Sequence, residues 1–377
     1  MLRIFIILLL LPFSLLAQVH YDFSSIDHQL KNAPKIKNAD LSPLYEYFSE
    51  KSKNELESVR AIYHWIRLNI SYDEKAYNDG NRRINRTNTD IINRRKAICW
   101  GYANLFQEMA RAMGIESIII SGYARTQLSQ KYDLEEINHA WNAVKVDGYW
   151  HLLDVTWDSS LLGKKDEFAL KYERDYFLTA PQYFILTHLP ANPIWQLLNC
   201  PISAQQAQLP IDSLHSSITD YQCNTSKDTL ANFLKLNTEE RRFQEALATY
   251  NFNPTANNKH HLGNAFIDYH NYLDEQLVSL QETNQIDSIL ILQAEMIDCC
   301  EQAASMTKLL DKQQENCAYN YLNYAIALLS EHPKEEEKKK ALEQVEIARN
   351  MLEKLPSNFL IQQGLKRCEE VIEYINP

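Results

Sequence analysis

Hydrophobic residues recur at helical spacing twice in the first half of the chain. Between residues 58 and 70, apolar positions return every three or four residues, which predicts an amphipathic helix. Residues 97–114 repeat the pattern through Tyr102, Met109 and Met113 and end at Gly114. This predicts a buried helix with a left-handed glycine stop, and it places Cys99 in the first turn.

The next apolar segments have the pattern of strands. Ser117–Ala124 is short and rich in β-branched residues, which indicates a core strand. Asp147 and Gly148 form a strong two-residue turn signal, which predicts a hairpin between residues 139–146 and 149–156. The first half is therefore expected to mix helices with an antiparallel sheet.

The hairpin register makes a prediction about side chains. If Val146 pairs with Tyr149, Trp141 faces Asp154 across the two strands. Residues 139 and 141 share one face of the pleat, so His139 and Asp154 are expected to be diagonal neighbours within side-chain reach. Such a geometry lets a carboxylate hold an imidazole.

The second half has a different pattern. From residue 229 onward, long segments carry one apolar face each and are separated near Pro333 and Pro356, which predicts antiparallel helical hairpins. They indicate a bundle or a short array similar to tetratricopeptide hairpins, although no strict 34-residue repeat can be traced. We expect an α+β domain over residues 18–200, an irregular proline-containing linker over 201–228 and an all-α domain over 229–377.

The amino terminus has the features of an export signal. Arg3 precedes an apolar run over residues 4–16 that ends at Ala17. This predicts a signal peptide over residues 1–17, cleavage near Ala17 and a secreted or periplasmic protein; the alternative is a retained membrane anchor. Under the first interpretation, no membrane segment remains.

Charge and cysteine content restrict the function further. The formal net charge of -11 argues against a nucleic-acid partner. The chain has seven cysteines, so one free nucleophile would leave six for up to three disulfides in an oxidising compartment. Alternatively, several of them are buried small hydrophobic residues. The one strongly basic stretch, over residues 78–96, is either a solvated loop or a rim that binds an anionic substrate or favours a nearby thiolate.

The candidate chemistry combines Cys99, His139 and Asp154. A thiol at a helix amino terminus lies where the helix dipole favours the thiolate. His139 would serve as its base, and Asp154 would orient the base. The alternative is a metal site formed by Cys99, His139, His151 and Asp154. We expect no metal and no cofactor.

Three segments around these residues resemble the transglutaminase-like superfamily. They are R-K-A-I-C-W-G-Y-A around Cys99, N-H-A-W-N around His139 and W-H-L-L-D-V-T-W around Asp154. The resemblance covers residues 55–157. Residues 175–198 look like the continuation found in bacterial secreted members and in kyphoscoliosis-peptidase-like proteins. The resemblance to this superfamily implies a papain-like core, with Cys99 as nucleophile, His139 as acid and base and Asp154 as the orienting residue.

The resemblance also implies lesser roles. Trp100, Trp141 and Trp157 are expected to line the site and bind substrate, and Ala97 and Trp100 depart from the usual pattern without touching the triad. The backbone N–H of Cys99 is one oxyanion donor, and Trp65, Tyr72 or another upstream group is the second.

The expected activity is hydrolysis of amides in peptides or proteins, cell-wall peptide among them, through a thioester on Cys99. Polar segments at residues 78–96 and 125–136 flank the triad and suggest an open, wet cleft in which water outcompetes an amine, unless one of them closes as a lid. The alternatives are a transamidating acyl-transferase and a non-catalytic scaffold whose helical domain holds a protein partner.

Overall fold

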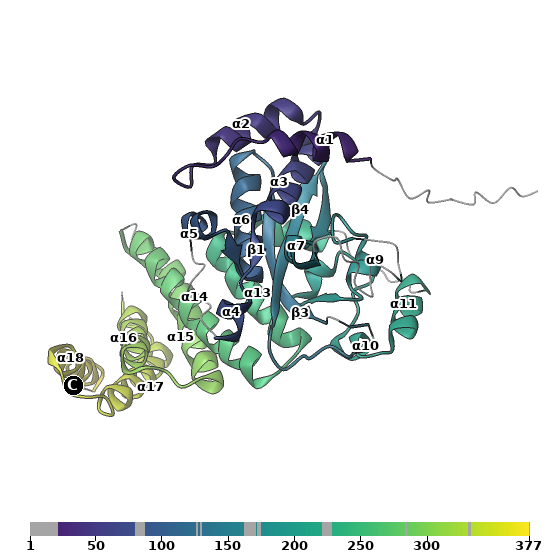
Figure 1. Ribbon diagram of the computed structural model, residues 1–377. Helices are drawn as coiled ribbons and strands as arrows, with labels where there is room; N and C mark the ends of the chain where they lie inside the picture. Colours follow the sequence, from purple (N-terminus) through teal and green to yellow (C-terminus); the bar gives the residue numbers. More distant parts are fainter. Residues whose placement is uncertain are drawn as a thin grey trace, which may run out of the picture.

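The computed structural model describes residues 22–79, 87–125, 127–128, 130–161, 171, 175–220, 228–282, 285–330 and 333–376. An α+β half is followed by a helical half, as expected, and helices α14–α18 extend away from the sheet toward the carboxyl terminus (Figure 1). The predicted signal peptide and much of the basic stretch lie outside the described residues.

The elements of the first half are, in chain order, α1 (Ser24–Gln29), η1 (Leu30–Asn32), α2 (Ser42–Lys51), α3 (Glu55–Asn69), β1 (Ser71–Tyr72), α4 (Glu74–Asn78), α5 (Asn88–Arg94), β2 (Lys96–Ala97), α6 (Cys99–Ala112), β3 (Ser117–Ala124), β4 (His139–Val146), β5 (Tyr149–Leu153), α7 (Val155–Leu161), α9 (Pro181–Phe184), β6 (His188–Pro190) and η2 (Pro193–Gln196). The two helices and the core strand predicted from the pattern are α3, α6 and β3.

The main sheet is antiparallel, in the order β5-β4-β3-β6. Val146 pairs with Tyr149, which confirms the predicted register, and the turn residues Asp147 and Gly148 both have positive φ, at 50° and 84°. Positive φ at both central residues matches the right-handed twist of the flanking strands.

The hairpin is shorter than predicted. Its ladder ends where Asn142 pairs with Leu153, and the expected strand residues 155 and 156 instead begin helix α7. The backbone N–H of Asp154 donates to the carbonyl of Tyr176 at 2.9 Å rather than to β4. The pairing therefore stops one residue before Asp154.

Each face of the sheet has its own hydrophobic core. Val144 and Leu153 point to the face covered by α3 and α6. Trp141 and Leu152 point to the opposite face, together with residues of α9, η2 and the segment that follows. The alternation assigns consecutive residues of β4 to different cores.

One close approach fixes the distance between β3 and its neighbours. Gly122 pairs with His139 on one side and with Pro190 on the other. A Cβ built at Gly122 would lie 2.3 Å from the carbonyl oxygen of Leu189 and 2.6 Å from the ring of Trp141. Only a residue without a side chain fits at this position.

The second half contains α10 (Ala204–Ala207), α11 (Ile211–Asp220), α12 (Asp228–Lys235), α13 (Thr238–Phe252), α14 (Ala256–Glu282), α15 (Ile286–Met306), α16 (Asp311–Leu328), α17 (Glu335–Leu352) and α18 (Phe359–Ile375). Sequential helices from α13 to α18 pack against one another as hairpins. None of the helices in the described part of the chain is both long and apolar enough to cross a membrane.

The segment predicted to be an irregular linker carries the helices α10 and α11. Ala207 and Leu214 are fully buried in the core beneath the sheet, and Phe233 of α12 joins the same core. Pro210 directly precedes α11, and the capping residue Ser203 separates Pro201 from α10, so this segment is not an unstructured connection. The domain limits themselves stay predictions.

Polar contacts also tie α13 and α14 to the sheet half. The side-chain amides of Asn253 and Asn258 donate to the buried hydroxyl of Tyr123 on β3, at 2.9 and 3.0 Å. Asn192 donates to Glu245 of α13 at 2.7 Å. Because α13 also packs on α14, it is shared between the two halves.

The cysteines are partly paired. Cys300 and Cys317 form a disulfide between α15 and α16, and Cys200 is also disulfide-bonded. Cys299 and Cys368 are free thiols that lie buried among the helices, whereas the free thiol of Cys99 is partly accessible. With three free thiols, the cysteines do not form three disulfides, and Cys299 and Cys368 fit the alternative of buried small residues.

Candidate active site

Cys99 opens helix α6 at the end of a short parallel strand pair. Tyr72 of β1 pairs with Ala97 of β2, and the N–H of Asp73 donates to the carbonyl of Ala97 at 2.9 Å. These contacts fix the chain immediately before Cys99. The thiol lies at the positive end of a helix of 14 residues, where a thiolate is favoured.

His139 and Asp154 are in direct contact. The Nε2 atom of His139 lies 2.8 Å from Oδ2 of Asp154, and both side chains are almost fully buried. The hairpin register brings the chain close to His139 as far as Leu153, and the turn into α7 then positions Asp154. Since Nε2 is committed to the carboxylate, Nδ1 is the ring nitrogen left for the thiol of Cys99.

The carboxylate of Asp154 is held at both oxygens. Its Oδ1 atom accepts the backbone N–H of Thr156 at 2.7 Å, in the first turn of α7. This is the capping contact that an aspartate makes at a helix amino terminus, and it explains why the strand ends there. The second oxygen, Oδ2, faces the histidines and is held by them.

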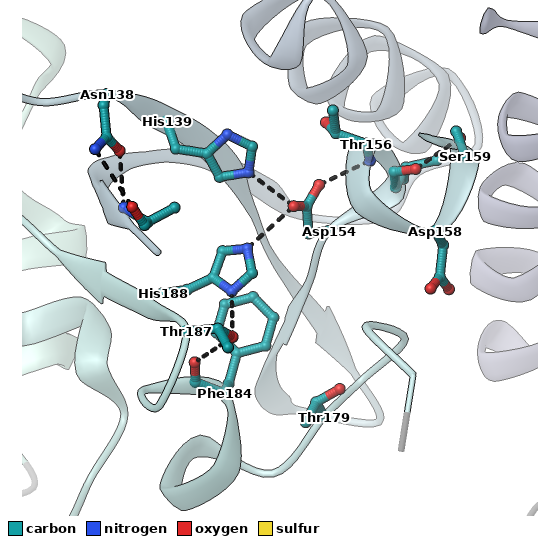
Figure 2. A network of polar contacts seen from close by, with 12 residues as sticks. Asn138, His139, Asp154, Thr156, Asp158, Ser159, Thr179, Phe184, Thr187 and His188 are labelled. Carbon is teal, nitrogen blue, oxygen red and sulfur yellow. Dashed lines mark hydrogen bonds and ion pairs between the residues drawn. The ribbon is translucent and has the colours of Figure 1, made fainter. Parts of the chain in front are cut away.

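A second histidine, which sequence reasoning missed, contacts the same oxygen. Nε2 of His188 on β6 lies 3.1 Å from Oδ2 of Asp154, and its Nδ1 lies 2.9 Å from Oγ1 of Thr187. Figure 2 shows both imidazoles pointing at the same oxygen of Asp154. The one sequence signal was a polar Thr-His pair in the apolar run 184–191.

The electrostatics of the site favour an ion pair. Burial alone would raise the pKa of Cys99, but the hydrogen bond and charge of His139 and the N–H of Ala140 lower it below the ordinary thiol value. Burial would lower the pKa of His139, yet the charge and hydrogen bond of Asp154 raise it to about 10. Both shifts favour the thiolate of Cys99 and the imidazolium of His139 over the neutral pair.

Asp154 stays ionised despite its burial. Desolvation would raise its pKa, but the charge and hydrogen bond of His139, followed by the hydrogen bond of His188, hold the pKa well below its usual range. A permanently charged carboxylate is what stabilises an imidazolium beside it.

The three tryptophans differ in their access to a substrate. Trp100 is 50% exposed beside Cys99, and Trp157 is half-buried with its ring centroid 5.6 Å from that of His139. Trp141 is only 1% exposed and packs beneath the histidines, so the prediction that it binds substrate is wrong. Its odd-numbered position on β4 directs it into the second core.

The alternative metal set is not assembled. His151 pairs with Val144 on the hairpin, three residues before Asp154, and so lies on the other face of the pleat. Among the described residues, the cluster with ligand atoms close enough for a metal is His139, Asp154 and His188. Its contacts are those of a hydrogen-bonded network, because Asp154 accepts at both oxygens.

The candidates for a second oxyanion donor are separated by burial. Trp65 is almost fully buried in the α3 core, beneath the guanidinium of Arg95. Tyr72 is half-buried, and after burial itself the negative charge of Cys99 is the strongest influence raising its pKa above the normal range. Of the two, Tyr72 is thus the candidate whose hydroxyl interacts electrostatically with the sulfur.

A further carboxyl group, that of Asp158, shares a hydrogen-bond partner with Asp154. The hydroxyl of Tyr63 on α3 hydrogen-bonds to the carboxyl of Asp158 and to the backbone carbonyl of Asp154. Burial, followed by the charge of Asp175, raises the pKa of Asp158 to about 7. Its folded-state pKa therefore exceeds the unfolded value, so its contribution to stability is present below pH ~4 and is lost as pH rises through about 7.

We expect Asp158→Asn, which mimics the neutral acid, to raise the free energy of unfolding at pH 8 by on the order of 3 kcal/mol and to change it little at pH 4. Thermal denaturation of both proteins across this range is the measurement. Equal melting temperatures at pH 8 would mean that Asp158 is not held as a neutral acid.

The fold and the site together define an α+β protein in which a buried histidine–aspartate pair accompanies a partly accessible cysteine at a helix amino terminus. Residues 43–155 match the family model described as the Transglutaminase-like superfamily. The chain therefore carries a transglutaminase-like domain.

Two curated relatives are kyphoscoliosis peptidases from Mus musculus and Homo sapiens. Each is 39% identical over 170 residues, which make up 44% of this chain and 25% of the relative. The Lim and transglutaminase domain protein ltd-1 of Caenorhabditis elegans is 27% identical over 201 residues, which make up 49% of this chain and 27% of that protein. The matched part thus spans about a quarter of the length of these relatives.

Proposed function

We propose that the chain is a cysteine-nucleophile amide hydrolase that acts on peptides or proteins. The observation that supports this most is the commitment of His139 Nε2 to Asp154, which leaves Nδ1 for Cys99 and favours the thiolate–imidazolium pair. The curated relatives named kyphoscoliosis peptidase carry the same activity class in their names.

The reaction follows from these positions. The Cys99 thiolate attacks the amide carbonyl carbon, and the resulting oxyanion accepts hydrogen bonds from the N–H of Cys99 and the hydroxyl of Tyr72. The imidazolium of His139 gives its proton to the leaving amine as the C–N bond breaks, which leaves a thioester on Cys99. His139, now neutral, takes a proton from water as it attacks the thioester, and release of the acid restores the thiolate–imidazolium pair.

Water is the proposed acceptor because transfer to an amine requires a site that excludes water. A closing lid would need a mobile segment, whereas the segment after β3 is pinned to the core. Arg125 donates to the carbonyl of Leu186 at 2.7 Å, its guanidinium stacks on Tyr132, and Gln208 donates to the carbonyl of Tyr132 at 2.9 Å. These contacts argue against a lid formed by the segment after β3.

The test is product analysis by mass spectrometry with a cleavable peptide and an excess of a primary amine, using the full chain. The proposal predicts free acid as the main product and no product from Cys99→Ala. A predominance of amine adduct that depends on Cys99 would assign the chain to the transamidating acyl-transferases. No product of either kind, with a folded protein, would favour the non-catalytic scaffold.

Export is part of the proposal. The basic residue and apolar run at the amino terminus fit a signal peptide, and the disulfide between Cys300 and Cys317 suits an oxidising compartment. Fractionation of the producing cells, with detection of the chain outside the cytoplasm and of a new amino terminus near Gln18, tests this.

We expect Tyr72→Phe to lower kcat by about 10²- to 10³-fold with little change in KM, because it removes a donor that acts on the oxyanion of the transition state. Tyr77→Phe is the matched control, since Tyr77 lies next to Tyr72 with ring centroids 6.2 Å apart and is 50% exposed. Steady-state kinetics of both variants decide; a loss below threefold in Tyr72→Phe would remove it from the mechanism.

A further inference from the structure

His188 is a buried titratable group for which the triad chemistry has no use. It is completely buried and comes from β6, an edge strand distant in sequence from the other site residues. Four aromatic rings surround it, with Phe184 stacked on its face at 4.4 Å and Trp157 at the same centroid distance. Burying a polar ring this way is costly unless both nitrogens are hydrogen-bonded, and both are.

We propose that His188 is a positioning residue: a neutral imidazole, fixed in one tautomer by Thr187, that holds the carboxylate of Asp154 in place for His139. This inference rests on the proposed function, because it assigns His188 a role in maintaining the thiolate–imidazolium pair.

The tautomer follows from the two contacts of Thr187. Its hydroxyl lies 2.9 Å from Nδ1 of His188 and 3.4 Å from the carbonyl oxygen of Phe184. The longer distance exceeds the usual range for an O–H donor, so the hydroxyl of Thr187 donates its proton to Nδ1 rather than to the carbonyl of Phe184. Nδ1 of His188 is then an acceptor, and its Nε2 carries the proton that it donates to Asp154.

Charge repulsion supports the same assignment. The two imidazoles share a single oxygen, Oδ2 of Asp154, at 2.8 and 3.1 Å. If both carried a positive charge, each would lower the proton affinity of the other. A neutral His188 avoids this and leaves the full negative charge of Asp154 to the His139 imidazolium.

Three hydrogen-bond donors together hold the carboxylate of Asp154 in one orientation. The N–H of Thr156 holds Oδ1 of Asp154, and His188 and His139 approach Oδ2 from two sides (Figure 2). Without the donor on His188, the carboxylate can rotate about its contact with Thr156. His139 would then lose its fixed orientation toward Cys99.

The experiment measures the pH dependence of Cys99 alkylation by iodoacetamide in the full chain, with the labelled peptide identified by mass spectrometry, so it requires no substrate. His188→Phe keeps the ring volume but removes the donor, and Thr187→Val keeps His188 but removes the contact that fixes its tautomer. Phe184→Leu is the matched control, because it disturbs packing on the same ring without a hydrogen bond. Melting temperatures are recorded for all proteins.

We expect the midpoint of alkylation to move upward by about one pH unit in His188→Phe, which is about a tenfold slower reaction below the midpoint, and by less in the same direction in Thr187→Val. Phe184→Leu should lower the melting temperature and leave the midpoint in place. If His188→Phe does not fold, an upward shift in Thr187→Val alone supports the proposal.

Two results would overturn it. Unchanged midpoints in the folded variants, or an equal shift in Phe184→Leu, would show that His188 only fills space. A wild-type midpoint equal to that of an ordinary thiol would overturn both the ion pair and the role of His188. The first result leaves the proposed function standing, whereas the second does not.

Discussion

Replacing Cys99 by alanine is expected to lower kcat/KM for amide cleavage by at least about 10⁴-fold, because it removes the nucleophile of the covalent step. Among the described free thiols, Cys99 alone combines partial access with a lowered pKa. Burial raises the pKa of Cys368 to about 11, and burial raises that of Cys299 to about 12. The measurement is the initial rate of product formation with equal amounts of folded protein.

Cys368→Ala is the matched control. Cys368 is a free thiol in the core of the helical half, far from the site in the fold, so its loss should leave the rate unchanged. Retention of more than a tenth of the activity in Cys99→Ala would contradict the thiol mechanism. An equal loss in both variants would point instead to a general effect of cysteine removal on folding.

The second large effect is expected for Asp154→Asn, with a loss of about 10³- to 10⁴-fold in kcat. The N–H of Thr156 needs an acceptor, so the amide oxygen of the asparagine should occupy the place of Oδ1. The amide NH₂ group would then face His139 and His188, where the carboxylate had accepted. His139 would be forced to accept at Nε2 and to carry its proton on Nδ1, which is the wrong nitrogen for removing a proton from the thiol.

The loss of charge acts in the same direction. Asp154 raises the pKa of His139 to about 10, so without it the imidazolium gives up its proton at lower pH and the thiolate of Cys99 loses its partner. We therefore expect slower alkylation of Cys99 at pH 7 as well as lower kcat. A kcat within tenfold of the wild type, in a protein with normal melting behaviour, would show that Asp154 does not orient His139.

The local parts of this site could be predicted from the sequence. The turn at Asp147 and Gly148 determines the register of β4 and β5, and the strand alternation, continued one residue past the ladder, predicts Asp154 on the side of His139. Helix α6 follows from its apolar spacing and from the glycine after it. Both inferences depend on neighbours in the chain.

The non-local parts were missed for physical reasons. His188 reaches Asp154 because the three-residue strand β6 pairs with β3, and a strand that ends in Pro190 has little pattern of its own. Trp141 was misassigned because it shares the face of His139 but lies two residues farther into β4, where the rings of Phe184 and His188 pack against it. The helices α10 and α11 were missed because Pro201 and Pro210 lie before them, and the sequence pattern does not distinguish a proline that precedes a helix from a proline in a loop.

Gly122 has a consequence for comparing this chain with its relatives. Its missing side chain lets β3 lie close enough to Leu189 and Trp141 for His139 and His188, one on each neighbouring strand, to meet at a single carboxylate oxygen. A relative that keeps cysteine, histidine and aspartate but carries a larger residue at the equivalent of Gly122 must push these strands apart. In a genome survey, the residue at this position would therefore separate chains in which both histidines can contact the aspartate from chains that have the three triad residues without this contact.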